Sequence, residues 1–345
     1  MTPVKMSTVK SKPIKQKGIA LITSLLIVTL ASTAAVTITA QLQREIRRSG
    51  NMLHHDQAYI YALAAEDFAR YGLKLDHDAG KTDHLNELWH IIPVSEDIDG
   101  GTLEGKLKDL QGLFNINNLA NKKAPDLQRF KRLLTNLQLT NEEIQQVTAS
   151  LQDWLDTDQT STLGYGAEDD YYQGLAEPDR PYLAGNRMLS NLSELRLIKG
   201  FSNELLTKLR INPSYDEETG ELLTPVFTAL PEYTELNINT APAEVLKSLD
   251  IKITDEIAQK IISRRDGSVL EGGDVTPFES VDDLKKHLES IAIKNVNVEA
   301  LSVSTQYFLL NAKTTIGQMT MNLYSQLKRD DKGISTVVSR SQGVY

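Results

Sequence analysis

The sequence has 345 residues, of which 40% are hydrophobic and 24% charged, and this composition is typical of a globular protein. There is no cysteine, which excludes disulfides, thiolate metal sites and cysteine nucleophiles together. The 37 basic side chains include five lysines in residues 1–18, where there is no acid. The rest of the chain carries 32 basic against 46 acidic side chains, a net charge of −14. Such an acidic body repels phosphate backbones, so we expect no nucleic-acid partner.

The stretch from Gly18 to Gln43 contains no charged residue. A helix needs roughly 20 mostly apolar residues to span a bilayer, and the apolar stretch of a cleaved signal peptide is shorter, about 7 to 15 residues. The run therefore predicts a membrane-spanning helix. Apolar residues at loosely helical spacing follow it, so we expect one helix from Ile19 to about Leu75.

Beyond this helix the pattern changes twice. Short strands are indicated from Leu88 to Leu119, with a turn at residues 99–101. Helical patterning then extends from about Asp126 to Leu288, and polar and apolar residues alternate again from Val296, with a hairpin turn at residues 330–333. Strands early and late with helices between them predict an α+β fold, in which a large helical domain is inserted into one antiparallel sheet.

The predicted insertion contains a weak internal repeat, which predicts two similar helical modules. Three pairs of segments match: FNINNLA with LNINTAP, LLTNLQLTNEEIQQV with VLKSLDIKITDEIAQKI, and LSNLSELRLI with FESVDDLKKHL. The second module resembles half of a helix-hairpin-helix unit, which binds phosphate through a glycine-rich hairpin. Residues 249–254 stand where those glycines belong and include none. We therefore expect a structural use of the module.

An acidic loop, residues 153–179, is the strongest site signal. It holds eight carboxylates and no lysine or arginine. Calcium takes six to eight oxygen ligands in flexible loops and suits such a cluster. The loop is no EF-hand, because Ser161 stands where the EF-hand glycine is required. From charge alone, a solvated acidic loop without a metal remains the alternative.

The N-terminus resembles a type IV prepilin, because a short basic leader ends at Gly18 directly before the apolar run. This resemblance implies cleavage between Gly18 and Ile19 and N-methylation of Ile19. Ordinary pilins and pseudopilins have a glutamate at the fifth mature position, where this chain has Thr23. The absence of this glutamate is typical of the K-type minor pseudopilins of type II secretion.

Several further stretches resemble the K-type minor pseudopilin family, general secretion pathway protein K: DQAYIYALAAEDFAR, DWLDTD, GAEDDYY and PYLAGNRMLSNLSELRLIKG. The resemblance implies a pilin-like long N-terminal helix packed on an antiparallel sheet. We expect no enzyme, because the sequence has no GxSxG motif and no carboxylate pair marked out for acid–base catalysis; a membrane-tethered hydrolase, the rival, would need a clustered nucleophile and base. The resemblance also implies calcium in the helical domain. The expected ligands are Asp156, Asp158, Glu168, Asp169 and Asp170, with Asp153 and Glu177 as further candidates.

The same resemblance implies a single-pass protein of the inner membrane with its bulk in the periplasm. It would cap the tip of the pseudopilus, join the I-type and J-type minor pseudopilins, prime assembly, and contact cargo or the secretin. A minor pilin of a type IV fibre, used in adhesion or DNA uptake, is the alternative. The expected parts are the leader 1–18, the assembly helix 19–43, the helix remainder and first strands 44–119, the inserted helical domain 120–290 and the last strands 291–345.

Overall fold

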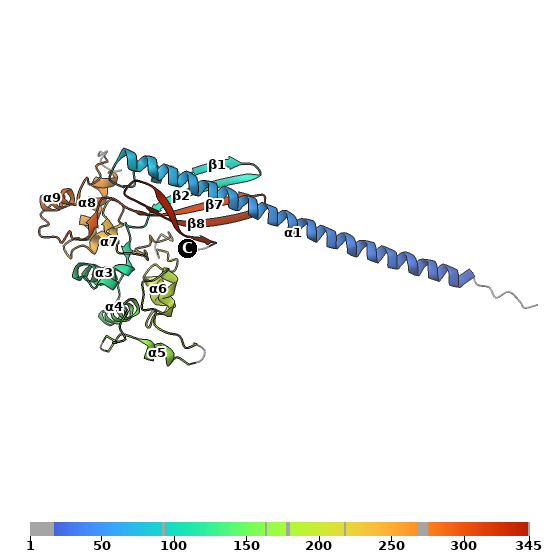
Figure 1. Ribbon diagram of the computed structural model, residues 1–345, viewed down its shortest axis with the longest axis horizontal. Helices are drawn as coiled ribbons and strands as arrows, with labels where there is room; N and C mark the ends of the chain where they lie inside the picture. The colour runs from blue at the N-terminus through green and yellow to red at the C-terminus, as the bar shows by residue number, and fades with distance from the viewer. Residues whose placement is uncertain are drawn as a thin grey trace, which may run out of the picture. The chain divides into compact units, whose positions relative to one another are not determined.

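The computed structural model describes residues 17–91, 94–162, 164–176, 180–216, 219–267 and 275–343. The expected leader up to residue 16 lies outside this range. The contacts within the chain divide it into two compact units, Met1–Gln57 and Ala58–Tyr345 (Figure 1). Each unit is described by itself below.

The first unit contains the apolar part of helix α1, Lys17–Ala79. This helix confirms the one expected from Ile19 to about Leu75. Its most apolar window has a mean hydropathy of 2.3 and no buried residue, so the helix is long and apolar enough to cross a membrane. The Thr23 hydroxyl donates to the carbonyls of Ile19 and Ala20, both at 3.0 Å, so its polar group is satisfied within the helix.

In the second unit the last turns of α1 pack on a five-stranded antiparallel sheet (Figure 1). The contact face of the helix is a stripe of mostly small side chains at helical spacing, which allows the helix backbone to approach the strands closely. These side chains are buried against Phe308 and Leu323 of the sheet, and they are Ala58, Ala62, Ala65, Ala69 and Leu73.

The sheet has the strand order β1-β2-β7-β8-β9. Its members are β1 (Val94–Ile98), β2 (Gly101–Asp109), β7 (Tyr307–Ile316), β8 (Met319–Arg329) and β9 (Ser335–Gln342). Neighbours β2 and β7 are far apart in sequence, and the helical part of the chain lies between them. This arrangement confirms the expected insertion of a helical domain into one antiparallel sheet. Both expected turns form, with Gly100 at φ 81° and Gly333 at φ 77°, a backbone region that favours glycine.

Two stretches of the region expected as strands, residues 88–119, are helical: the first four residues, and the last four, which begin the 3-10 helix η1 (Ile116–Asn121). Residues Leu88–Ile91 form the single-turn helix α2. The Trp89 ring meets the Phe308 ring edge-on at 5.3 Å, and its Nε1 donates to Glu87 at 2.7 Å. These contacts of the Trp89 side chain stabilise the helical turn. A segment of four residues is too short for the spacing of its apolar residues to predict a helix.

The insertion consists of two modules, as the repeat predicts. The first comprises β3 (Phe114–Asn115), η1 (Ile116–Asn121), α3 (Ala124–Asn136), α4 (Asn141–Leu155), α5 (Asp169–Gln173), η2 (Leu192–Leu197), α6 (Asn203–Lys208) and β4 (Phe227–Thr228). The second comprises β5 (Leu236–Asn237), α7 (Ala243–Lys247), α8 (Asp255–Asp266), α9 (Val281–Ser290) and β6 (Leu301–Ser302). In each module the first and last strands pair in parallel. Equivalent threonines, Thr140 and Thr254, cap the second helix of each module.

Buried hydrogen bonds join the insertion to the sheet. The Asn237 amide at the start of the second module donates to the Asp83 carbonyl at 3.0 Å and to the Asp109 carboxylate at 2.9 Å. The hydroxyl of Thr240 also donates to Asp109. Arg329 of β8 donates to the Asp83 carboxylate. One polar network therefore holds the two parts of this unit together.

Candidate metal centre

The structure brings together three of the predicted acidic ligands. Asp156, Asp158 and Glu168 each offer a carboxylate oxygen, and these oxygens all lie within 4.8 Å of one another. Asp156 directly follows α4, and Glu168 directly precedes α5. The polypeptide between them forms a loop that returns the chain to the end of α4.

This loop interrupts the first module where the second has a much shorter connection. Residues 156–188 join α4 to the last helical segments of the first module, and residues 267–277 occupy the equivalent place in the second. Apart from the five-residue helix α5, the described residues of this segment form no helix or strand, and long connections of this kind are uncommon in compact domains unless they have a function. The acidic cluster therefore lies in the part of the repeat that is specific to the first module.

Asp153 closes the loop at its base. Its buried carboxylate accepts hydrogen bonds from the Thr162 backbone N–H at 3.0 Å and from the Thr162 hydroxyl at 2.6 Å. A Cβ atom on Gly166 would lie 1.9 Å from the Asp153 Oδ2 atom, so only glycine fits there. Asp153 is therefore a positioning residue of the loop and lies outside the group of three carboxylates.

An aromatic stack holds the other side of the loop. The Tyr172 ring of α5 stacks on Tyr182 at 5.2 Å and meets Trp154 of α4 edge-on at 5.3 Å. A Cβ atom on Gly185 would lie 2.5 Å from the Trp154 Nε1 atom, so the chain also passes close to this ring. These contacts position the helix that follows Glu168.

The three carboxylates repel one another. Burial, and after it the carboxylates of Asp153, Asp156 and Asp158, raise the pKa of Glu168 to about 7. Lys122 compensates in part, because its ammonium lies 3.0 Å from the Asp156 Oδ2 atom. The group of three carboxylates therefore has one cationic side chain beside it, which is too little positive charge to balance three ionised acids.

The donor atoms fit a divalent cation. Both carboxylate oxygens of Glu168 and the Oδ1 atom of Asp156 are buried and have no hydrogen-bond partner in the described part of the chain. Glu168 is only 5% exposed. Calcium binds oxygens at about 2.3 to 2.6 Å, so two of its ligands lie at most about 5 Å apart, and the observed oxygen spacing falls within that limit. A buried acid with two orphaned oxygens facing two further acids is the arrangement that such an ion stabilises.

The other predicted ligands lie elsewhere. The Asp169 Oδ1 atom accepts the Ala184 backbone N–H at 2.8 Å, which ties α5 to the returning chain. Asp170 is exposed, and Glu177 lies outside the described residues. Their roles as ligands stay predictions. Sequence reasoning missed Lys122, because no local pattern links it to an acid so far along the chain.

A second carboxylate group consists of Asp76, Asp83 and Glu87. Here the Arg329 guanidinium already lies among the acids, 3.3 Å from Asp76 and hydrogen-bonded to Asp83. Burial followed by the neighbouring carboxylates raises the pKa of Asp76 to about 7. This cluster belongs to the network that joins the insertion to the sheet.

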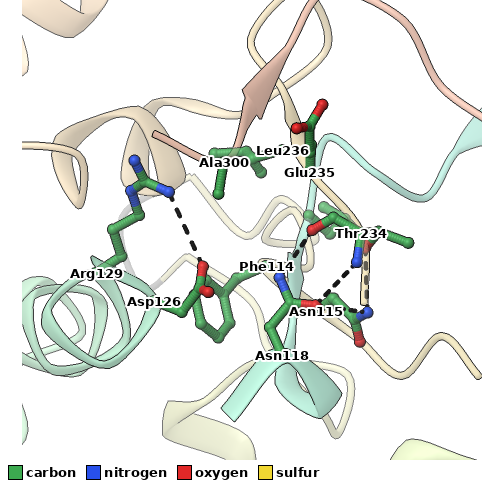
Figure 2. Close-up of a pocket in the computed structure, with 10 residues that line it drawn as sticks. Phe114, Asn115, Asn118, Asp126, Arg129, Thr234, Glu235, Leu236 and Ala300 are labelled. Atoms are coloured by element: carbon green, nitrogen blue, oxygen red, sulfur yellow. Dashed lines mark hydrogen bonds and ion pairs between the residues drawn. The ribbon is translucent and has the colours of Figure 1, made fainter. Parts of the chain in front are cut away.

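A small cavity lies where the first module meets the second. Asn115, Asn118, Asp126 and Arg129 line it from the first module, and Leu236 and Ala300 line it from the second (Figure 2). Its volume is about 10 Å³, room for about one water molecule. The Asp126 Oδ2 atom has no partner among the described residues, while Arg129 donates to the backbone carbonyls of Asn297 and Glu299. A cavity of this size admits no organic ligand, so we assign these side chains to the packing of the two modules against each other.

The fold is pilin-like: the first part of the N-terminal helix is apolar and long enough to cross a membrane, its last turns pack on an antiparallel sheet, and a helical domain is inserted into that sheet. A solved structure agrees: this chain is similar to a chain in the crystal structure of the GspK-GspI-GspJ complex from enterotoxigenic Escherichia coli, with a TM-score of 0.70 and 23% identity. The match covers 86% of this chain and 100% of that one. At this identity the likeness shows the fold.

Sequence comparisons identify the family. Residues 112–212 and 236–304 match two family models described as type II secretion system (T2SS), protein K. The chain is 35% identical to type II secretion system protein K of Pseudomonas aeruginosa over 95% of this chain and 93% of that protein. It is 31% identical to the protein K of Aeromonas hydrophila over 73% of this chain and 76% of that protein. The chain belongs to the type II secretion system protein K family, which confirms the predicted resemblance and makes it a minor pseudopilin of type II secretion.

Proposed function

We propose that this chain caps the tip of the type II secretion pseudopilus and primes its assembly together with an I-type and a J-type minor pseudopilin. The observation that carries the proposal is the match in fold to a protein solved in a GspK-GspI-GspJ complex. In this arrangement α1 lies in the inner membrane, the bulk of the chain lies in the periplasm, and the pseudopilus supports protein export across the outer membrane.

Thr23 supports an end position. In the interior of a pilin filament a carboxylate at this place would neutralise the N-terminal amine of a neighbouring subunit. Thr23 instead bonds to its own helix, and no acid precedes Glu45 in the apolar run. A buried amine without a counter-charge is costly, so a subunit of this kind is poorly suited to interior positions.

The helical insertion supports the same position by an independent argument. Its modules, from β3 to β6, comprise more than half of the chain and are additional to the helix and sheet of the pilin-like fold. Bulk of this extent leaves no room for a further subunit to continue the filament beyond it. Processing between Gly18 and Ile19, with N-methylation of Ile19, would release the assembly helix from its leader.

We further propose that calcium occupies the group formed by Asp156, Asp158 and Glu168. The orphaned, buried oxygens of Glu168 and Asp156 support this site. Calcium would link the start and end of the long loop and thereby stabilise the first module. The ion is structural in this proposal, because Asp156 and Glu168 lie at the two ends of the loop segment that it would close.

Co-assembly tests the tip proposal. The full chain, expressed in membranes together with I-type and J-type minor pseudopilins, should co-purify with both in detergent and restore export in a strain that lacks its own protein K. A matched preparation with the major pseudopilin alone should not yield a comparable complex. Export without any association with the I-type and J-type proteins would contradict the proposed tip complex.

A further inference from the structure

A groove in the helical insertion lies outside the candidate metal site. It has a volume of about 570 Å³ and runs between α5 and the chain that connects η2 to α6. Tyr172, Ile198 and Phe201 are buried beneath it, whereas Tyr171 is 42% exposed and Leu197 is 45% exposed along it. A volume of this order is typical of ligand-binding clefts, and exposed aromatic and aliphatic side chains supply contact area.

The groove is positively charged. Three cations line it, Arg180, Arg196 and Lys199, and no acid does so among its described lining residues. Arg196 donates to the neutral amide of Asn212 at 2.8 Å, and Lys199 donates to the Gly166 carbonyl at 2.9 Å. These bonds fix both side chains without neutralising them. In a body that is otherwise strongly acidic, the groove is a local site for negative charge.

The pattern fits an extended acidic peptide. Cationic side chains and exposed apolar surface stand side by side, so a strand that alternates carboxylate and apolar side chains can satisfy both. A nucleic acid is a poor fit, because its long phosphate backbone would meet the acidic remainder of the chain. The preferred occupant is therefore a short polypeptide segment.

The position of the groove favours an exported protein over a partner pseudopilin. Within the second unit, α5 lies at the opposite end from the last turns of α1, and α6 lies between α5 and the sheet (Figure 1). On those turns the side chains of Phe68, Tyr71 and Leu75 are 60%, 61% and 52% exposed. They form a separate apolar face, which can contact the helices of other pilin-like subunits.

We propose that this groove, between Tyr171, Arg196, Leu197 and Lys199, binds an extended acidic segment of an exported protein. The inference rests on the proposed role in secretion. The groove is also linked to the metal loop, because Lys199 holds the Gly166 carbonyl and its ammonium lies 4.8 Å from the centre of the Tyr171 ring. Both partners flank Glu168, so calcium at the acidic cluster should order one wall of the groove.

Peptide binding tests the groove. The full chain in detergent is titrated into a fluorescein-labelled hexapeptide of alternating glutamate and leucine, with a glutamine and leucine hexapeptide as the control. We expect only the acidic peptide to bind, and we expect Arg196→Glu to lower the affinity for this peptide about tenfold or more. Lys286→Glu makes the same charge change on exposed α9 and should alter affinity less than about twofold. Chelation of calcium should weaken binding of the acidic peptide.

Equal binding of both peptides, or equal losses in the two charge variants, would overturn the proposal. If Arg196→Glu lowers the melting temperature, Arg196→Gln replaces it, since glutamine retains a donor for Asn212. A photo-crosslinker at exposed Leu197 in secreting cells should capture an exported protein. Adducts with the I-type or J-type protein, or with a second copy alone, would contradict the choice of partner. Because co-purification with those proteins is measured separately, a failed groove leaves the proposed tip complex standing.

Discussion

The side-chain amide of Asn239 makes two hydrogen bonds to the backbone of Phe278: its Nδ2 donates to the carbonyl oxygen and its Oδ1 accepts from the N–H, both at 2.9 Å. Asn117 bonds in the same way to Leu189, at 2.9 and 2.8 Å. Both asparagines are fully buried. The equivalent residues of the repeat thus make equivalent contacts, which confirms the two-module prediction at the level of single atoms.

Replacement of Asn239 by alanine should destabilise the second module strongly. The change removes two hydrogen bonds and leaves the buried N–H and C=O of Phe278 without partners, which costs about 2 to 4 kcal/mol. Urea unfolding of the full chain in detergent measures the loss. Asn141→Ala, at an exposed position of α4, should change the free energy of unfolding by less than about 0.5 kcal/mol. Similar losses in the two variants would contradict this role of Asn239.

Calcium should raise the melting temperature of the wild-type chain relative to chelator. A ligand that binds only the native state stabilises it by about 2.7 kcal/mol at a hundred times its dissociation constant. Glu168→Gln should lose most of this gain. In chelator the same variant should melt at or above wild type, because it removes a buried carboxylate from beside two others.

Glu289→Gln is the matched control, because it makes the same change at an exposed carboxylate of α9, outside the acidic loop and the group of three carboxylates. It should keep the calcium-dependent gain. Identical melting curves of the wild-type chain with and without chelator, together with no calcium by elemental analysis, would refute the site.

Gly166→Ala should weaken calcium binding without altering any charge. The added Cβ atom would lie 1.9 Å from the Asp153 carboxylate and displace the base of the loop. We expect a lower melting temperature and at least about a fivefold higher calcium dissociation constant by isothermal calorimetry, which corresponds to about 1 kcal/mol. Gly80→Ala meets no atom within 4 Å and should behave as wild type. An unchanged calcium affinity in Gly166→Ala would show that the loop base does not position the ligands.

The Asp76 cluster should make stability depend on pH. Burial, then the carboxylates of Glu87 and Asp83, raise the pKa of Asp76 from 3.8 to about 7. Between about pH 4 and 7 the unfolded chain loses this proton while the folded chain keeps it. The stability contributed by protonated Asp76 is therefore complete below about pH 4, declines as the pH rises to about 7, and is constant above it.

Asp76→Asn stays neutral and should lack this decline, so its stability relative to wild type should increase from pH 5 to pH 8. Urea unfolding at several pH values measures the difference. Asp78→Asn, which changes an exposed carboxylate paired with Lys74, is the control and should follow the wild-type profile. Parallel pH profiles of Asp76→Asn and wild type would contradict the assignment.

Thr23→Glu should change the location of the chain and leave its fold intact. The new carboxylate lies in the apolar run and can neutralise the N-terminal amine of a neighbour, which removes one obstacle to interior positions. We expect unchanged melting of the full chain but crosslinks to the major pseudopilin on both sides. Thr29→Glu places the same charge farther along the helix and should not produce them. A wild-type crosslinking pattern in Thr23→Glu would remove the support that Thr23 gives to capping.

Much of the fold was predictable because its signals are local or periodic. The uncharged run and helical spacing predicted α1, and three pairs of matching segments predicted the two modules. The acidic loop pointed to Asp156, Asp158 and Glu168. The sequence did not show that Asp169 lies outside this group. Its carboxylate binds the Ala184 N–H, and that contact forms only when the chain folds back on itself. The parallel strand pairs and the groove also depend on such long-range contacts.

The Asn237 amide, which binds both the Asp83 carbonyl and the Asp109 carboxylate, has a mechanical consequence. The bonds are buried and lie where two covalent connections, before β3 and after β6, already enter and leave the insertion. A force applied along Ala58–Ala79 would therefore be transmitted to the helical modules, because these hydrogen bonds and chain connections resist bending between the sheet and the insertion.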